Sequence, residues 1–365
     1  MNEVYDKVIM IADVHYGVHA SALEWVENID SYFYDFFIPL LKKEKTDNTC
    51  LIILGDYFEN RQNLDINVMN SAIAVIKELA SLMPVYMVIG NHDIYRKSTI
   101  ETNSLRCVEN IPNVYAIDEN GIREIKMANN EKITMISWVG DHLEETNLIN
   151  RYKTESRFIL MHTEVCGMKY DNGRDITEGA VVKLNKCRCK VYSGHIHKRQ
   201  ESKNVTYIGS PYHLDRKDIG NQKGVYILYT EGNEVMEKFI PNNFSPEFIE
   251  PILTAANGAW SLNIPIEKIT NNYVEVFMSK ESADAINQAE VQKVLLDYKP
   301  KSLEFSLIQS EINIDVNLDH IEKTDVSDVF DKTVTAMELT EEQKQRLVEL
   351  NSNYVKTALN ELGIK

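Results

Sequence analysis

The sequence contains no apolar segment close to the roughly 20 residues that a membrane-spanning helix needs. Its first residues lack the basic and apolar regions of a secretory signal peptide. Basic side chains are the minority, because 39 Lys and Arg stand against 55 Asp and Glu, for a formal net charge of −16. We therefore expect a cytoplasmic protein that does not contact membranes, and the charge taken alone argues against a nucleic-acid partner.

Cysteine is also scarce, and its five positions do not suit a disulfide framework. An odd number of cysteines in a chain of 365 residues is typical of reduced thiols in the cytosol. Cys187 and Cys189 are one residue apart, which is the wrong spacing for a zinc knuckle, and we expect them to alternate along a strand.

The charge is unevenly distributed along the chain. Residues 245–365 contain 11 basic and 21 acidic side chains, whereas residues 165–223 contain 12 basic and 6 acidic ones. This basic stretch surrounds the sequence Gly194-His195-Ile196-His197. Bound divalent cations would add positive charge at the same place, so the distribution leaves a polyanionic partner open.

The first two thirds of the chain alternate between short apolar runs and helical patterns. Five runs are predicted as buried strands, namely Val8–Ala12, Cys50–Leu54, Val85–Ile89, Phe158–Met161 and Lys190–Ser193. The clearest helix is Asn67–Met83, where Val68, Ala72 and Val75 share one face and Pro84 follows the end. This alternation predicts an α/β fold.

The length and the position of Ile240-Pro241-Asn242-Asn243 predict three parts, 1–243, 244–325 and 326–365. The second part is expected to be a small α+β unit, with strands Tyr273–Met278 and Leu303–Ile308 and a helix Ser282–Tyr298 between them. The third part is expected to be a helix pair, with helices beginning at Val326 and Thr340.

Each predicted strand of the first part runs directly into a motif of possible metal ligands. The motifs are Asp13-Val14-His15, Gly55-Asp56, Gly90-Asn91-His92-Asp93, His162 and Gly194-His195-Ile196-His197. Ligands in open α/β sheets bind beyond the carboxyl ends of the strands, so five strand ends can form one site. Residues two apart in extended chain face the same way, which lets each Asp-x-His or His-x-His pair point into that site.

The donor set is a mixture of oxygen and nitrogen ligands. It consists of Asp13, His15, Asp56, Asn91, His162, His195 and His197. Such a mixture suits manganese, iron or zinc better than calcium or magnesium. Two such cations can acidify a water and hold a phosphate for attack. His92 is expected to face away from the metals as the general acid, with Asp93 to orient it or to stabilise its charge.

Each motif taken alone has a plainer interpretation as a turn or as packing. Their occurrence in order, each at a strand end, favours the metal site, since five of the nine histidines fall within them. The other four histidines are expected to be structural rather than substrate-facing; they are His19, His142, His213 and His320.

Together the five motifs resemble those of the calcineurin-like metallophosphoesterase superfamily, which implies a four-layer α/β/β/α sandwich. Val205–Pro211 and Phe239–Asn243, followed by a small cap domain and a terminal helix pair, resemble the SbcD-type recombination nucleases. Within that branch, the arrangement is most similar to the recombination endonuclease subunits of T-even-type phages.

The resemblance implies one metal held by Asp13, His15, Asp56 and His197 and a second held by Asp56, Asn91, His162 and His195. It implies two divalent cations, manganese first, with iron, zinc or magnesium as alternatives. The implied activity is 3′-to-5′ exonuclease action on double-stranded DNA and endonuclease action on single strands, in recombination and repair. The implied partner is an SbcC-type, SMC-like coiled-coil ATPase bound by the C-terminal helices. A homodimer through Asn67–Met83 or Thr99–Val108 and a location in the host cytoplasm are also implied.

Glu59 departs from this pattern, because many members of the branch have a histidine three residues after the bridging aspartate. An acidic residue there, followed by Arg61, is closer to the phosphatases of the superfamily. A phosphomonoesterase with the same metals is therefore the alternative function. A non-catalytic scaffold is a third possibility, although all ligand positions are filled.

Several side chains that follow the motifs are candidates for substrate binding. The basic ones are Arg61, Arg96, Lys198, Arg199 and Arg216, which could hold a DNA backbone or belong to ordinary charged loops. Tyr16 and Tyr212 lie near the predicted rim and could stack on an unpaired base, although packing is the plainer interpretation.

Overall fold

The computed structural model describes residues 3–96, 99–117, 120–184, 187–308 and 345–346. Residues up to 308 form one compact unit. The predicted C-terminal helices lie outside the described residues, except that Gln345 and Arg346 are helical. Among the described residues, no helix combines the length and apolarity that crossing a membrane requires.

The first of two large sheets has six strands in the order β15-β14-β2-β3-β4-β7. Their bounds are β2 Lys7–Ile11, β3 Thr49–Leu54, β4 Val85–Val88, β7 Val114–Ala116, β14 Gly224–Glu231 and β15 Glu234–Pro241. Strands β2, β3, β4 and β7 are parallel, and β14 and β15 add antiparallel strands at one edge. Three of the predicted strands are therefore confirmed here, to within one residue at each end.

The second sheet has seven strands in the order β1-β8-β9-β10-β11-β13-β12. Their bounds are β1 Val4–Tyr5, β8 Ile122–Met127, β9 Lys132–Ile136, β10 Phe158–His162, β11 Lys190–Gly194, β12 Gln200–Ser202 and β13 Val205–Tyr207. The parallel strands β9, β10, β11 and β13 form its centre. Cys187 and Cys189 precede β11, so the expectation that they alternate along a strand is wrong, whereas all five cysteines are free as predicted.

Alternating apolar side chains explain why the two sheets pack face to face. Val8 and Met10 of β2 point into a core between the sheets, together with side chains from β3, β8, β9 and β10. Ile9 and Ile11 point the other way, into a core that helices cover. Both faces of the central strands of the first sheet are therefore buried, which their near-continuous apolar sequences require.

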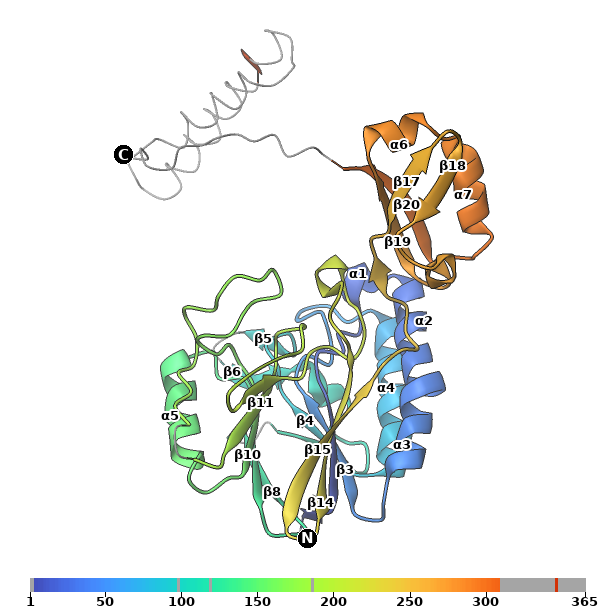
Figure 1. The fold of residues 1–365 in the computed structure, drawn as a ribbon. Coiled ribbons are helices and arrows are strands. Elements are labelled where there is room, and N and C mark those ends of the chain that lie inside the picture. Colours follow the sequence, from blue (N-terminus) through green and yellow to red (C-terminus); the bar gives the residue numbers. More distant parts are fainter. Residues whose placement is uncertain (1–2, 97–98, 118–119, 185–186, 309–344, 347–365) are drawn as a thin grey trace, which may run out of the picture. The chain divides into compact units, whose positions relative to one another are not determined.

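Helices complete the four layers on the outer faces of the two sheets (Figure 1). The first sheet is covered by α2 Leu23–Ser31, a π-helical segment Tyr32–Phe37, α3 Ile38–Glu44 and α4 Ile66–Leu82. The second sheet is covered by α5 His142–Tyr152 and by the chain between β10 and β11. The α/β/β/α sandwich is confirmed. Short elements lie in the connections of the first sheet, namely α1 Val18–Ser21 after β2, and β5 Ile94–Arg96 and β6 Thr99–Asn103 between β4 and β7.

Residues 248–307 form a small α+β module with its own apolar core. Its elements are β16 Phe248–Ile249, β17 Ile252–Ala256, β18 Ala259–Leu262, β19 Tyr273–Met278, α6 Lys280–Asp284, α7 Gln288–Leu296 and β20 Ser302–Leu307. The single predicted helix Ser282–Tyr298 is wrong, because the chain leaves the helix after Asp284. The Asn287 side chain then accepts a hydrogen bond from Ala289 and begins a new helix.

Aromatic stacking joins this module to the sandwich. The ring of Trp25 in α2 lies parallel to that of Tyr273 in β19, with centroids 5.3 Å apart. The Tyr273 hydroxyl accepts a hydrogen bond from Asn28 Nδ2 at 2.7 Å and donates one to Glu24. Aromatic contacts of this kind bury a large area for few rotatable bonds, so this joint contributes to holding the module in place.

Candidate metal centre

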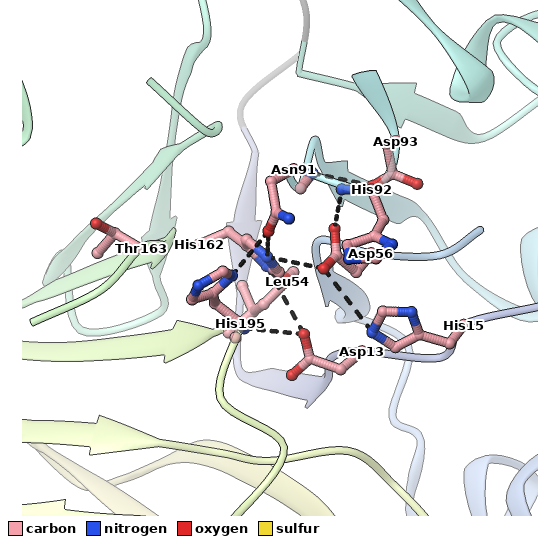
Figure 2. A network of polar contacts seen from close by, with 12 residues as sticks. Asp13, His15, Leu54, Asp56, Asn91, His92, Asp93, His162, Thr163 and His195 are labelled. Carbon is pink, nitrogen blue, oxygen red and sulfur yellow. Dashed lines mark hydrogen bonds and ion pairs between the residues drawn. The ribbon is translucent and has the colours of Figure 1, made fainter. Parts of the chain in front are cut away.

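The polar side chains after the central strands of both sheets meet in one cluster (Figure 2). Strands β2, β3 and β4 of the first sheet lead to Asp13 with His15, to Asp56 and to Asn91, respectively. In the second sheet, β10 ends in His162, and β11 leads to His195 and His197. The structure therefore brings all seven predicted ligands together at the carboxyl ends of the five strands.

The backbone at the ligands is unusual. Asp13, His15, Asp56 and His195 all have positive φ, at 54°, 53°, 51° and 84°. Residues other than glycine seldom adopt this region, and it concentrates at functional sites where the surrounding structure enforces it. The turn that follows each strand thus directs the ligand side chain inward.

The glycines of three motifs lie where backbone and ligands approach one another closely. A Cβ on Gly90 would stand 2.2 Å from Asp56 Oδ1, and one on Gly55 would stand 2.3 Å from His162 Nδ1. A Cβ on Gly194, in the second sheet, would stand 2.3 Å from the carbonyl oxygen of Leu54 in the first. No residue with a side chain fits at these three positions without displacing the cluster.

The first half of the cluster consists of Asp13, His15 and His197. The Nε2 atoms of His15 and His197 face each other at 3.1 Å. One oxygen of Asp13 accepts the backbone N–H of His195 at 2.8 Å, while the other is buried and has no hydrogen-bond partner among the described residues. Two facing ring nitrogens beside an unpartnered buried carboxylate oxygen fit a cation, which all three would bind.

The second half consists of Asp56, His162 and His195, with Asn91 between them. Asp56 Oδ2 lies 3.1 Å from His162 Nε2, and Asn91 Oδ1 lies 3.0 Å from the same nitrogen. His195 turns Nδ1 toward Asn91 Oδ1 at 2.7 Å. Asp56 Oδ2 is also 3.8 Å from His15 Nε2, so this carboxylate is shared between the two halves. The donor set therefore fits two divalent cations that share Asp56.

The charges inside the cluster perturb the pKa values of its members. Burial alone would lower the pKa of His15, but the hydrogen bond to Glu59 and the charge of Asp56 raise it to about 8. Burial opposes the charge of His162 as well, yet Asp56 raises its pKa to about 9. Although burial acts against it, His162 holds the pKa of Asp56 far below its ordinary range. Asp56 is thus ionised, as a cation-binding carboxylate must be.

Three acidic residues that we did not predict contact the ligand imidazoles from outside. Glu59 Oε2 is 2.5 Å from His15 Nδ1, and Glu164 Oε1 is 3.1 Å from His195 Nε2. Asp171 Oδ2 is 4.0 Å from His197 Nδ1. A carboxylate on the second ring nitrogen fixes the orientation of a metal-binding histidine and raises its basicity. Of these three residues, only Glu59 could be singled out from the sequence, because it departs from the pattern of the resembled family.

His92 lies beside the cluster with half-exposed side-chain atoms (Figure 2). Its backbone N–H donates to Asp56 Oδ1 at 2.7 Å, and its Nδ1 is 2.8 Å from the Glu59 carbonyl oxygen. A carbonyl partner makes Nδ1 the protonated nitrogen, which leaves Nε2 for a substrate.

Asp93 does not orient this ring, contrary to expectation. Its carboxylate is buried and accepts the backbone N–H groups of Gly90 at 2.9 Å and Phe58 at 3.2 Å. Burial and the charge of Asp56 raise the pKa of Asp93 to about 7. Asp93 therefore holds together the two loops that carry Asp56 and His92, and Glu59 is the acidic residue at the ring.

The two tyrosines expected at the rim are core residues instead. Tyr16 is 0% exposed and donates its hydroxyl to Asp30 at 2.8 Å. Tyr212 is buried and donates to the Val14 carbonyl oxygen at 2.6 Å. The rim position predicted for Tyr16 as a substrate contact is therefore wrong, because its loop folds inward against α2 and α4.

The basic candidates separate into two groups. Arg199 lies over the Phe239 ring at 4.4 Å and donates to the Gln222 carbonyl oxygen, and Arg216 forms ion pairs with Glu275 and Glu304. Both therefore serve internal contacts. Arg61, Arg96 and Lys198 are at least partly exposed, and within the described part of the chain none of them forms an ion pair.

Three of the remaining histidines have structural partners, as expected. His19 stacks on Trp25 and His142 pairs with Glu145 at 3.0 Å. His213 accepts the backbone N–H of Phe248 at 3.2 Å. His320 lies outside the described residues.

A four-layer sandwich with this donor set at its strand ends defines a metal-dependent phosphoesterase. Residues 6–199, more than half of the chain, match the calcineurin-like phosphoesterase family. The chain belongs to the calcineurin-like phosphoesterase family.

Viral proteins are among its relatives. The chain is similar to Exonuclease subunit 1 of Enterobacteria phage T4, at 29% identity over 241 residues, which cover 65% of this chain and 68% of that protein. It is also similar to Putative phosphoesterase 244L of Invertebrate iridescent virus 6, at 28% identity with 56% and 69% covered. Putative phosphoesterase 078R of Invertebrate iridescent virus 3 is 25% identical, with 56% of each chain covered.

Proposed function

We propose that this chain is a DNA nuclease subunit that hydrolyses phosphodiester bonds with two divalent cations, manganese first. The observation that carries the proposal is the complete set of seven donors around a shared Asp56, with the partly exposed ring of His92 beside it. The similarity to an exonuclease subunit of phage T4 supports DNA as the substrate. The 3′-to-5′ exonuclease and single-strand endonuclease activities are part of this proposal.

The cations would be held by the two halves of the cluster, with Asp56 between them. When bound, such cations supply an acidified water and neutralise the charge on the phosphoryl oxygens. Asp13, Asp56 and Asn91 provide oxygen donors, while His15, His162, His195 and His197 provide nitrogen donors. Glu59 and Glu164 keep the rings of His15 and His195 in their donor orientation.

His92 would donate the proton that the departing oxygen needs. The carbonyl oxygen of Glu59 holds Nδ1, so Nε2 is the nitrogen that can face the substrate. In the protonated ring, Nε2–H gives its proton to the leaving oxygen as the phosphorus–oxygen bond breaks. The bond from the His92 backbone to Asp56 keeps this acid at a fixed position relative to the cluster.

The DNA backbone would be bound by the cationic side chains that have no internal ion pair. Arg61, Arg96 and Lys198 meet this condition within the described residues. The basic stretch 165–223 contributes less than its composition indicates, because Lys190, Arg216 and Lys223 are paired with acidic side chains. We therefore propose a DNA path close to the metal centre and not one along the whole basic stretch.

The proposal includes an assembly. An SbcC-type ATPase would bind the C-terminal residues 326–365, and two copies would dimerise through the outer helical layer. Ile66 at the start of α4 is 70% exposed and Leu23 at the start of α2 is 63% exposed, which supports a contact at this layer.

One feature favours a second function, a phosphomonoesterase. Glu59 occupies the position where the superfamily's phosphatases have an acidic residue, and it contacts both His15 and His92. An assay of the purified chain on single- and double-stranded DNA with Mn²⁺, with and without the ATPase, separates the two. Cleavage of DNA is expected. Robust turnover of a phosphomonoester without any DNA cleavage would instead establish the phosphatase.

A further inference from the structure

Residues 209–223, which we call the strap, pack against the loop that carries His197. The backbone of Gly209, at φ 73°, lies so close that a Cβ there would stand 2.6 Å from the His197 carbonyl oxygen. Ser210 donates its N–H to the same oxygen at 3.0 Å. Asn221 Oδ1 accepts from Arg199 N at 2.8 Å, and Asn221 Nδ2 donates to Arg199 O at 3.1 Å. The strap therefore forms hydrogen bonds with the backbone of the predicted ligand His197 and of Arg199.

Lys223 ends the strap and is 2% exposed. Its ammonium donates three hydrogen bonds, to the His197 carbonyl oxygen at 2.5 Å, to Ser210 Oγ at 2.9 Å and to Asp218 Oδ1 at 2.5 Å. A buried ammonium needs a paired charge and full hydrogen bonding, and this geometry provides both. One of the three bonds ends on the backbone of a predicted metal ligand.

Asp218 completes the pair and shapes the strap around it. It is 1% exposed, and its Oδ2 accepts the backbone N–H groups of Leu214 at 2.8 Å and Asp215 at 3.3 Å. The Lys223–Asp218 pair thus ties the turn at 214–218 to the carbonyl of His197. Neither side chain reaches solvent or belongs to the donor set of the metal centre.

The same strap carries contacts to the α+β module. Arg216 forms ion pairs with Glu275 of β19 and, at 2.9 Å, with Glu304 of β20. The backbone N–H of Phe248 in β16 donates to His213 Nδ1 at 3.2 Å. The strap therefore contacts the module through His213 and Arg216. It contacts the loop that carries His197, which we call the metal loop, through Ser210, Asn221 and Lys223.

We propose that the strap couples docking of the α+β module to the cation that His197 binds, with Lys223 as the positioning residue. The inference rests on the two-cation site of the proposed function. By thermodynamic linkage, module docking and cation binding at this half of the centre strengthen each other. Among the described residues, the half formed by Asp56, His162 and His195 has no such contact with the strap. Its affinity for a cation should therefore depend less on docking of the module.

The main experiment replaces the buried pair in the full chain, as Lys223→Met together with Asp218→Asn. The double change leaves no unpaired buried charge, and the amide oxygen introduced at position 218 can still accept from the strap backbone. Circular dichroism and thermal melting check the fold, and calorimetric titration with Mn²⁺ measures both affinities. We expect one affinity to fall about 10–100-fold, as for other residues that support metal ligands, and the other to stay unchanged.

Two comparisons sharpen this measurement. Lys238→Met removes a lysine whose ion pair with Glu44 lies at the surface, and both Mn²⁺ affinities should then equal those of the wild type. His197→Ala should lose the same cation as the double variant. Two wild-type affinities in a folded double variant would overturn the proposal, because a pair that only stabilised the fold would give that result.

A measurement on the wild-type chain keeps the proposal testable if the double variant does not fold. Hydrogen–deuterium exchange should slow across residues 210–223 and in β19 and β20 when Mn²⁺ is added. Arg216→Gln should remove the protection in β19 and β20 while that of the metal loop persists. Unchanged exchange in the strap on Mn²⁺ binding would refute the coupling. Neither measurement uses DNA, so a failed nuclease assay would not affect the outcome.

Discussion

The two sheets of the sandwich contribute different chemistry to one centre. The six-stranded sheet supplies both carboxylates, the amide, one imidazole and His92, whereas the seven-stranded sheet supplies three imidazoles. Each half of the cluster nevertheless combines ligands from both sheets, since His197 joins Asp13 and His15, and Asp56 joins His162 and His195. Neither sheet alone therefore supplies either of these two halves, and the core packed between the sheets is part of the centre.

The largest effect is expected from the ligand that the two halves share. Asp56→Asn should abolish hydrolysis and weaken both cations, because Asp56 faces His162 at 3.1 Å and His15 at 3.8 Å. His162→Gln, in the opposite sheet, should weaken one cation only. Titration with Mn²⁺ and a phosphodiesterase assay check both. An Asp56→Asn variant that still bound two cations tightly would contradict the sharing of this carboxylate.

His92 tests the other side of the comparison, since it comes from the first sheet and is proposed to act as an acid and not as a ligand. His92→Ala should lower kcat by about 10²–10⁴-fold, the contribution of a general acid, and leave Mn²⁺ binding unchanged. Single-turnover cleavage of a phosphodiester measures the rate, and titration measures the binding. If a substrate with a good leaving group were slowed as much as ordinary DNA, the role as acid would be wrong.

The outer carboxylates allow a matched comparison between the sheets. Glu59→Gln and Glu164→Gln should each weaken activity and Mn²⁺ binding within about 10–100-fold. We expect the larger loss for Glu59, because its carboxylate is nearer to its imidazole, at 2.5 Å against 3.1 Å, and also lies 3.7 Å from His92 Nδ1. Reversed losses would show that the second sheet's ligands depend more on their orientation, and equal losses would show that the difference in distance has no effect.

The smallest effect concerns pH in the metal-free protein. The pKa of His15 is raised to about 8 and that of His162 to about 9, against an ordinary value of 6.5. A raised imidazole pKa stabilises the fold fully below pH 6.5, and this contribution is lost as pH rises through about 8 and 9. Melting with a chelator should therefore show Tm falling over this interval.

Mn²⁺ weakens that trend, because it replaces the protons on the two rings. Its apparent affinity should increase over the same pH interval, and the Tm of the Mn²⁺-bound protein should fall less. A metal-free Tm that rose between pH 6.5 and about 9 would contradict the charge state assigned to the cluster.

The strands and the ligands could be predicted because they depend on local sequence. An apolar run such as Cys50–Leu54 is buried wherever it lies, and the polar residue that follows it must emerge at the strand end. The outer contacts could not be predicted, since Glu164 and Lys223 act on histidines that only the fold brings near. The contacts of Tyr16 and Asp93 could not be predicted for the same reason, because their partners Asp30 and Phe58 depend on how the loops close.

The glycines of the motifs have a consequence for anyone who wishes to transplant this centre into another scaffold. Gly55, Gly90 and Gly194 allow the backbone to approach neighbouring groups more closely than a side chain would permit. Gly194 in particular lets the second sheet come close to the Leu54 carbonyl oxygen of the first. A recipient scaffold with the right seven side chains but a wider gap between its layers would separate the ligands of each half, because each half combines residues of both sheets. The short motifs therefore encode a separation between layers as much as a set of ligands, and a graft has to reproduce both.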